Sequence, residues 1–130
     1  MTAEEPDTSA QTTSVLLIDD EKEVRELYAL YLGQRYTVQT ASDGDVPVET
    51  VDDADIVFCD RRMPKQSGEE FLKRIRDAGL DVPVVFISAV DEIVRIDEEY
   101  QGYLTKPVDG ETLTQSVMDH VPETDLPMAD

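Results

Sequence analysis

The stretch DIVFCDRRMP, residues 55–64, runs from apolar and β-prone residues directly into an acid, two arginines and a proline. The four residues before Asp60 are typical of a parallel strand that is buried on both faces of its sheet. A carboxylate at the end of such a strand is costly unless a positive group meets it there. The stretch therefore predicts a buried strand and, beside Asp60, a cation that the rest of the chain must supply.

Other β-prone runs lie on both sides of this one, at residues 15–19, 36–40, 82–88 and 102–105. Helix-compatible segments separate them. Strands that alternate with helices predict βαβ units with right-handed crossovers and a parallel sheet covered on both faces. We expect one α/β domain over residues 14–121, because 130 residues suffice for a single core. Residues 1–13 read as a flexible acidic tail, and 122–130 as a C-terminal tail or the start of a linker.

The helical segments differ in strength. The segment 21–33 carries apolar residues at helical spacing and stops at a glycine; its predicted stripe is Val24, Leu27, Tyr28 and Tyr31. Ser67 and Glu70 have the spacing of a capping box, and Asp109 is placed to cap a last helix. Pro47 weakens any helix over 45–51, and the segment 90–99 has few apolar residues. These two helices should be short.

The composition limits the partners. There are 30 acidic against 11 basic residues, a net charge of -19, which repels nucleic acid and anionic lipid. We therefore expect no direct binding of this segment to either. The same surface suits a protein of a halophile, with an ordinary acidic domain as the alternative. One cysteine, Cys59, excludes an internal disulfide, and the polar N-terminus resembles neither signal peptide nor anchor, so we expect a cytoplasmic protein.

Polar residues end the predicted strands. In open α/β sheets, ligands lie outside the carboxyl ends of the strands. Carboxylates gathered there repel one another unless a cation joins them, and all-oxygen ligation suits Mg²⁺. One carboxylate is then free to attack phosphorus, while a lysine and a hydroxyl hold the phosphoryl oxygens. The alternatives without a functional site are that the two acids after the first strand only cap a helix and that the lysine is an ordinary surface residue. The residues concerned are Asp19, Asp20, Asp60, Ser88 and Lys106.

Four pieces together resemble the receiver domain of two-component response regulators: LLIDDE (16–21), FCDRRMP (58–64) with SGEEFL (67–72), ISA (87–89) and YLTKP (103–107). The resemblance covers residues 15–121. It implies a doubly wound, flavodoxin-like fold with a five-stranded parallel sheet of order 2-1-3-4-5. Against the family, the stretches 44–55 and 90–99 are trimmed, so the second and fourth helices should be shortened.

The resemblance also implies roles for individual residues. Asp60 would accept the phosphoryl group, and Ser88 and Lys106 would contact it. The Mg²⁺ shell would comprise Asp19, Asp20, Asp60 and the backbone carbonyl of Arg62. Tyr103 would be the rotameric switch, and Pro107 would follow a cis peptide bond. Arg62, two positions after the acceptor, predicts altered dephosphorylation.

The function implied is that of a switch rather than an enzyme. A histidine kinase or a phosphotransfer protein would phosphorylate Asp60 in a phosphorelay, and the changed surface would control an output domain, an effector or a homodimer. A role in the regulation of transcription is one expectation. One alternative is a small Mg²⁺-dependent phosphohydrolase with an aspartyl-phosphate intermediate. Against this alternative, the sequence has no second acid two positions after Asp60 that could serve as general acid or base. Another alternative is a degenerate receiver that serves only as a binding module.

Overall fold

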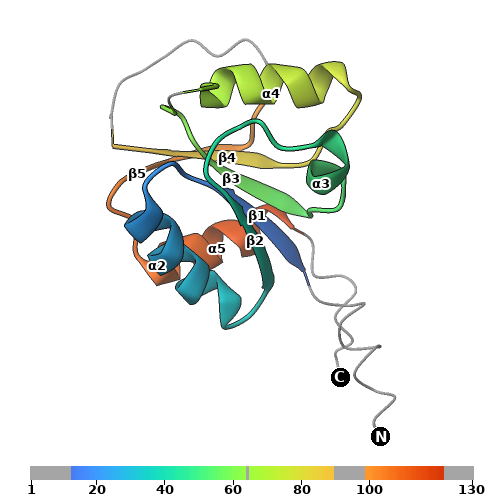
Figure 1. Ribbon diagram of the computed structural model, residues 1–130. Coiled ribbons are helices and arrows are strands. Elements are labelled where there is room, and N and C mark those ends of the chain that lie inside the picture. The colour runs from blue at the N-terminus through green and yellow to red at the C-terminus, as the bar shows by residue number, and fades with distance from the viewer. Residues whose placement is uncertain (1–12, 64, 90–98, 122–130) are drawn as a thin grey trace, which may run out of the picture.

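The computed structural model describes residues 13–63, 65–89 and 99–121, which form one parallel sheet with helices on both faces (Figure 1). The strand order is β2-β1-β3-β4-β5, as the resemblance implied. The strands are β1 Ser14–Ile18, β2 Thr37–Ala41, β3 Ile56–Asp60, β4 Val84–Ser88 and β5 Gly102–Thr105. The helices are α2 Lys22–Gly33, α3 Val48–Asp52, α4 Gly68–Asp77 and α5 Gly110–His120.

The sheet separates two apolar cores. Helices α3 and α4 cover one face, and α2 and α5 cover the other (Figure 1). Alternate residues of the central strands point into each core, so that Cys59 packs with Phe71 and Leu72 on the first face while Phe58 packs with Leu113 on the second. Every residue of β3 and β4 is buried, which confirms the reading of these strands as buried on both faces.

The predicted helix signals are largely confirmed. Ser67 and Glu70 form a complete capping box at the start of α4, and Asp109 caps α5 by accepting from the backbone of Thr112. Helix α3, the second of the family pattern, spans only five residues. The short fourth helix was expected over 90–99, of which residues 90–98 lie outside the described part.

The predicted stripe of α2 was wrong at one position. Leu27 is 45% exposed, whereas Leu32 is fully buried. Tyr28 and Leu32 pack in the core beside α5, and the Tyr28 hydroxyl accepts a hydrogen bond from the backbone N–H of Val108 at 3.2 Å. With this side of the helix facing inward, Leu27 lies on its outer side.

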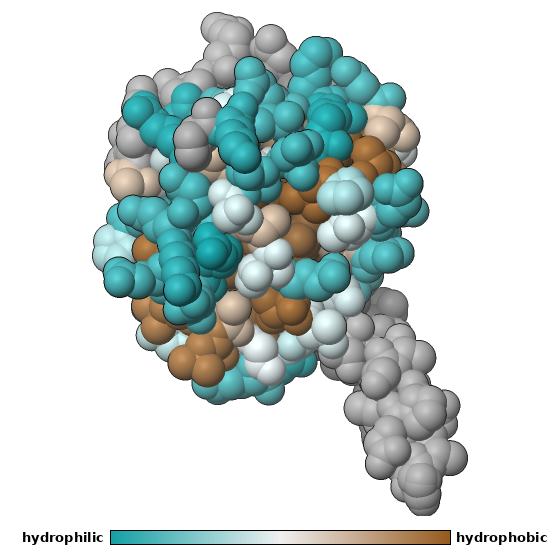
Figure 2. Space-filling view, viewed as in Figure 1, coloured by the Kyte–Doolittle hydropathy of each residue, from teal (hydrophilic) through white to brown (hydrophobic). Residues whose placement is uncertain are grey.

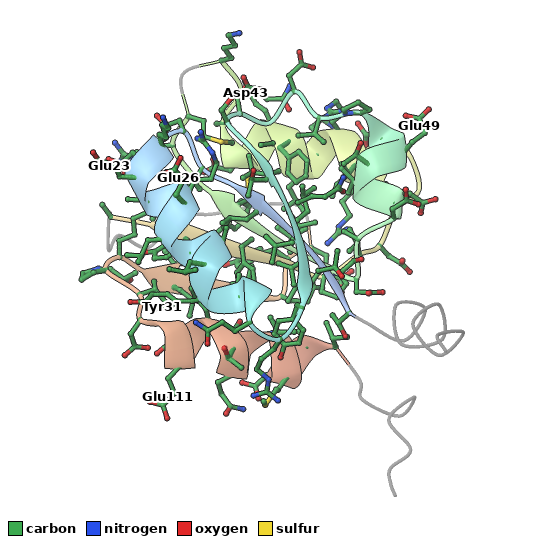
Figure 3. All side chains as sticks on the ribbon, turned by 60° about the horizontal axis from the view of Figure 1, so that its bottom comes forward. Glu23, Glu26, Tyr31, Asp43, Glu49 and Glu111 are labelled. Atoms are coloured by element: carbon green, nitrogen blue, oxygen red, sulfur yellow. The ribbon has the colours of Figure 1, made fainter. Side chains whose placement is uncertain are left out.

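The surface carries the negative charge that the composition predicts. Glu23 and Glu26 on α2, Glu49 on α3 and Glu111 on α5 point away from the sheet (Figure 3). Hydrophilic residues cover most of the face seen in Figure 2, with smaller hydrophobic patches between them. No helix among the described residues is long and apolar enough to span a membrane.

Candidate functional site

Three acids meet at the carboxyl ends of β1 and β3. Asp19 and Asp20 follow β1, and Asp60 is the last residue of β3. Each offers a carboxylate oxygen to a group whose members lie within 4.8 Å of one another. Asp19 and Asp60 are buried and Asp20 is exposed, so the cluster is open to solvent on one side. The topology brings these residues together because adjacent parallel strands end at the same edge of the sheet.

Lys106 is the cation that Asp60 requires. It follows β5, and its Nζ lies 3.2 Å from Asp60 Oδ2 and 2.9 Å from Asp19 Oδ2. The backbone N–H of Lys106 donates to the carbonyl of Ser88 at 2.8 Å, which continues the β4–β5 ladder and directs the lysine toward the acids. The peptide bond between Lys106 and Pro107 is cis. Only 11% of the Lys106 side chain is exposed, so the blander reading of a surface lysine is wrong.

Burial and charge act on the two partners in opposite ways. Burial is the main cause that raises the pKa of Asp60 above its ordinary value, and the charge of Asp19 adds to it. The backbone N–H of Arg62, 3.1 Å from Asp60 Oδ1, and the ammonium of Lys106 oppose this rise. Burial alone would lower the pKa of Lys106, but the surrounding carboxylates, Asp19 first, raise it above its usual range. The lysine is therefore charged at neutral pH.

The remaining predicted residues surround this cluster. Ser88 ends β4 and is buried. Tyr103 lies in β5, half-buried, with its ring centroid 6.3 Å from that of Phe86. Arg62 is exposed, and its backbone is tied to Asp60 by the N–H contact described above. The structure thus gathers Asp19, Asp20, Asp60 and Lys106 directly, and it places Ser88 and Tyr103 on the strands beside them.

The sequence reasoning gave no role to two acids near the site. Glu21 Oε1 lies 3.1 Å from Lys106 Nζ, which makes it a third carboxylate partner of the lysine. Glu69 in the first turn of α4 pairs with Arg61 at 2.6 Å. A contact between Glu21 and the lysine could have been predicted, because Glu21 directly follows the two aspartates at the end of β1. The Arg61–Glu69 pair carries no comparable signal, since the two residues are eight positions apart across a loop.

The donor set fits a hard divalent cation. Carboxylate oxygens from Asp19, Asp20 and Asp60 converge from two strands, and one side of the cluster faces solvent, where waters can complete an octahedral shell. Among the described residues, the ammonium of Lys106 shares this edge with them, and Nη1 of Arg25 donates to the backbone carbonyl of Asp19 at 2.7 Å. Such an excess of negative charge suits Mg²⁺, and the same edge can present a nucleophilic carboxylate beside a lysine to an incoming phosphoryl group.

The comparisons with known proteins agree with this geometry. Residues 15–118 match the Response regulator receiver domain family. A putative transcriptional regulator of Haloferax volcanii is 35% identical over 117 residues, which are 88% of this chain and 20% of that protein. The transcriptional regulatory protein DltR of Streptococcus agalactiae is 36% identical over 106 residues, which are 76% of this chain and 47% of that protein. The chain thus spans between a fifth and about half of the length of these relatives.

Solved structures share the fold. The chemotaxis protein CheY4 of Vibrio cholerae superposes with a TM-score of 0.77 at 25% identity, covering 85% of this chain and 99% of that one. The receiver domain of a putative response regulator NarL from Mycobacterium tuberculosis gives a TM-score of 0.74 at 26% identity, covering 83% of this chain and 94% of that one. The likeness therefore extends over nearly the whole of each solved domain.

Proposed function

The chain belongs to the response regulator receiver domain family, and from this premise we propose that residues 14–121 take up a phosphoryl group on Asp60 from a histidine kinase or a phosphotransfer protein. The observation that carries the proposal is the placement of Lys106 against Asp60 and Asp19 at the edge where Asp20 also lies. The family is one of signalling switches rather than of enzymes with a turnover product.

The residues divide the chemistry among them. An oxygen of the Asp60 carboxylate forms a bond to phosphorus while the P–N bond to the donor's imidazole breaks, which leaves an acyl phosphate on the chain and a neutral imidazole, after protonation, on the donor. The backbone N–H of Arg62 orients the Asp60 carboxylate by donating a hydrogen bond to Asp60 Oδ1. Lys106 and Ser88 contact the phosphoryl oxygens and stabilise the charge on them.

A magnesium ion belongs to this proposal. Asp19, Asp20, Asp60 and the backbone carbonyl of Arg62 would hold it. When bound, Mg²⁺ supplies neutralising charge to the phosphoryl oxygens. The convergence of the three carboxylates supports this assignment. Before the phosphoryl group arrives, Lys106 forms ion pairs with Asp19, Glu21 and Asp60.

The output is a change of surface, for which Tyr103 is the proposed rotameric switch. The named relatives are transcriptional regulators, and this supports a role in transcription through an output domain, an effector or a homodimer formed on phosphorylation. The negative charge makes this segment a poor binder of nucleic acid and of membranes, so the contact with DNA would come from another part of the system. We place the protein in the cytoplasm.

The test is an intact-mass measurement. The protein is incubated with Mg²⁺ and a small acyl phosphate donor in molar KCl, next to Asp60→Asn. We expect the mass of one phosphoryl group to appear only with Mg²⁺ and only in the natural chain. Circular dichroism establishes that both samples are folded. An unmodified mass in the folded natural chain would refute phosphoryl transfer to Asp60 and favour a domain that only binds.

A further inference from the structure

Arg61 is a buried cation in a strongly acidic protein. It directly follows the proposed phosphoacceptor, yet it is only 9% exposed, whereas its neighbour Arg62 lies open to solvent. Charged side chains are seldom buried unless they are paired. The roles described so far for the site do not use this side chain, so its placement calls for a separate explanation.

The contacts of Arg61 join several elements. Its Nε donates to Glu69 Oε2 of α4 at 2.6 Å, and its Nη1 donates to the hydroxyl of Tyr103 in β5 at 3.5 Å. Its backbone N–H donates to the carbonyl of Ile87 in β4, and its own carbonyl accepts from the N–H of Gly68 at the start of α4. One residue therefore connects the end of β3 with α4, β4 and β5.

The partner of Arg61 on β5, Tyr103, is half-buried and carries one polar side-chain group, its hydroxyl. The Tyr103 ring packs against Phe86 at a tilt of 51°, and its hydroxyl reaches Arg61. Buried or half-buried tyrosines usually find a partner for this hydroxyl. The planar guanidinium can serve Glu69 and Tyr103 at once, because its N–H groups diverge in a fixed fork. The pair with Glu69 thus aims the remaining donors of Arg61 at β5.

We propose that Arg61, fixed by Glu69, is a positioning residue that holds Tyr103 in an inward orientation before any phosphorylation. In this orientation the ring packs against Phe86 and the hydroxyl points to Arg61. This inference rests on the proposed function only for its consequence, which is that the switch begins from a biased orientation. The contact of 3.5 Å is long, so the bias is a shift in the population of the inward orientation rather than a lock. It also gives α4 and β5 a common contact at the residue after Asp60.

The experiment observes Tyr103 in the unphosphorylated protein. Protein with ¹³C-labelled tyrosine rings is examined by ¹H–¹³C correlation spectroscopy in molar KCl, and Tyr103→Phe identifies the signal among those of the five tyrosines. When the Tyr103 ring is inward, the nearby Phe86 ring changes the chemical shift of Tyr103 from that of a free tyrosine. We expect Arg61→Met to move the signal part of the way toward that position, and Glu69→Gln, which keeps an acceptor for Arg61, to move it little.

Two further variants make the test decisive. Arg35→Met is the matched control, because Arg35 lies over the ring of Tyr36 at 6.0 Å, so this variant should move the Tyr36 signal and leave that of Tyr103. Glu69→Ala releases Arg61 without removing it and should move the Tyr103 signal in the direction seen for Arg61→Met; it also serves if the methionine variant does not fold. A Tyr103 signal that stays in place in folded Arg61→Met or Glu69→Ala protein, or that moves together with all other tyrosine signals, would overturn the proposal. Because no donor is added, failure of phosphorylation at Asp60 leaves this result unaffected.

Discussion

Replacing Gly68 with alanine should weaken both the fold and the site, because α4 begins in close contact with the backbone after β3. A Cβ at this position would lie 2.8 Å from the carbonyl oxygen of Asp60, 2.8 Å from Cε1 of Phe86 and 2.9 Å from Cα of Arg61. Two of these atoms belong to the backbone of the acceptor segment, so they cannot swing aside. Reaching ordinary van der Waals contact at 3.4 Å requires a shift of about 0.6 Å.

The size of the effect follows from this geometry. Overpacking a tight contact costs about 1–3 kcal/mol in the free energy of unfolding, and we expect about 2 kcal/mol for Gly68→Ala. Misplacement of reacting groups by about 1 Å can cost roughly 10²-fold in rate, so a smaller shift at Asp60 should slow phosphorylation by about tenfold. Urea denaturation measures the first quantity, and intact mass against time with an acyl phosphate donor measures the second.

The matched control is Gly33→Ala, at the last residue of α2, where a new Cβ meets nothing within 4 Å. Alanine should leave the phosphorylation rate unchanged there and raise stability by up to about 1 kcal/mol through helix propensity. A Gly68→Ala protein with the urea midpoint and phosphorylation rate of the natural chain would refute the reasoning. Such a result would mean that α4 can move away from the acceptor segment at no cost.

Three further predictions concern the cap, the acceptor and the surface. Ser67→Ala removes the capping box of α4 and should lower the free energy of unfolding by about 1 kcal/mol in urea denaturation; an unchanged midpoint would contradict the role of the cap. Burial raises the pKa of Asp60, so the folded chain binds this proton more tightly than the unfolded chain, and stability falls as pH rises from the unfolded to the folded pKa. Asp60→Asn should therefore be the more stable protein in metal-free buffer at about pH 7, and its advantage should shrink toward about pH 4, whereas a constant difference in urea midpoint would argue against this sign. With a net charge of -19, the natural chain should gain stability between dilute buffer and molar KCl, measured as a rising thermal midpoint, and full stability in dilute buffer would speak against adaptation to salt.

The sheet and most of the acid cluster could be predicted from the sequence for a simple physical reason. Apolar runs that alternate with amphipathic segments force a parallel sheet, and parallel strands end at one edge. Residues that terminate separate strands, such as Asp19, Asp60 and Lys106, then lie along one edge, whatever their distance along the chain. Because β4 separates β5 from β3, the long side chain of Lys106 is also needed for its contact with Asp60.

Side-chain direction was not predictable in the same way. The spacing rule placed Leu27 on the inner stripe of α2, but it is the Tyr28–Leu32 side that packs in the core and meets the backbone of Val108. Likewise, two adjacent arginines look equivalent in DRRMP, but Arg61 is buried with Glu69 and Tyr103 as side-chain partners, whereas Arg62 is exposed. These features depend on contacts between elements, which neither periodicity nor composition encodes.

The charge balance of the site explains why its chemistry should depend on a divalent cation. Lys106 has carboxylate partners in Asp19, Glu21 and Asp60, and Asp20 adds another negative charge at the same edge. The ammonium of Lys106 and the guanidinium of Arg25, which donates to the backbone carbonyl of Asp19 at 2.7 Å, offset only part of these four negative charges, so we expect an anionic phosphoryl donor to be repelled from an otherwise well-placed nucleophile. A bound Mg²⁺ would offset much of that excess. Because Asp19 and Asp60 belong both to the acid cluster and to the partners of Lys106, we expect the metal to weaken their hold on the lysine.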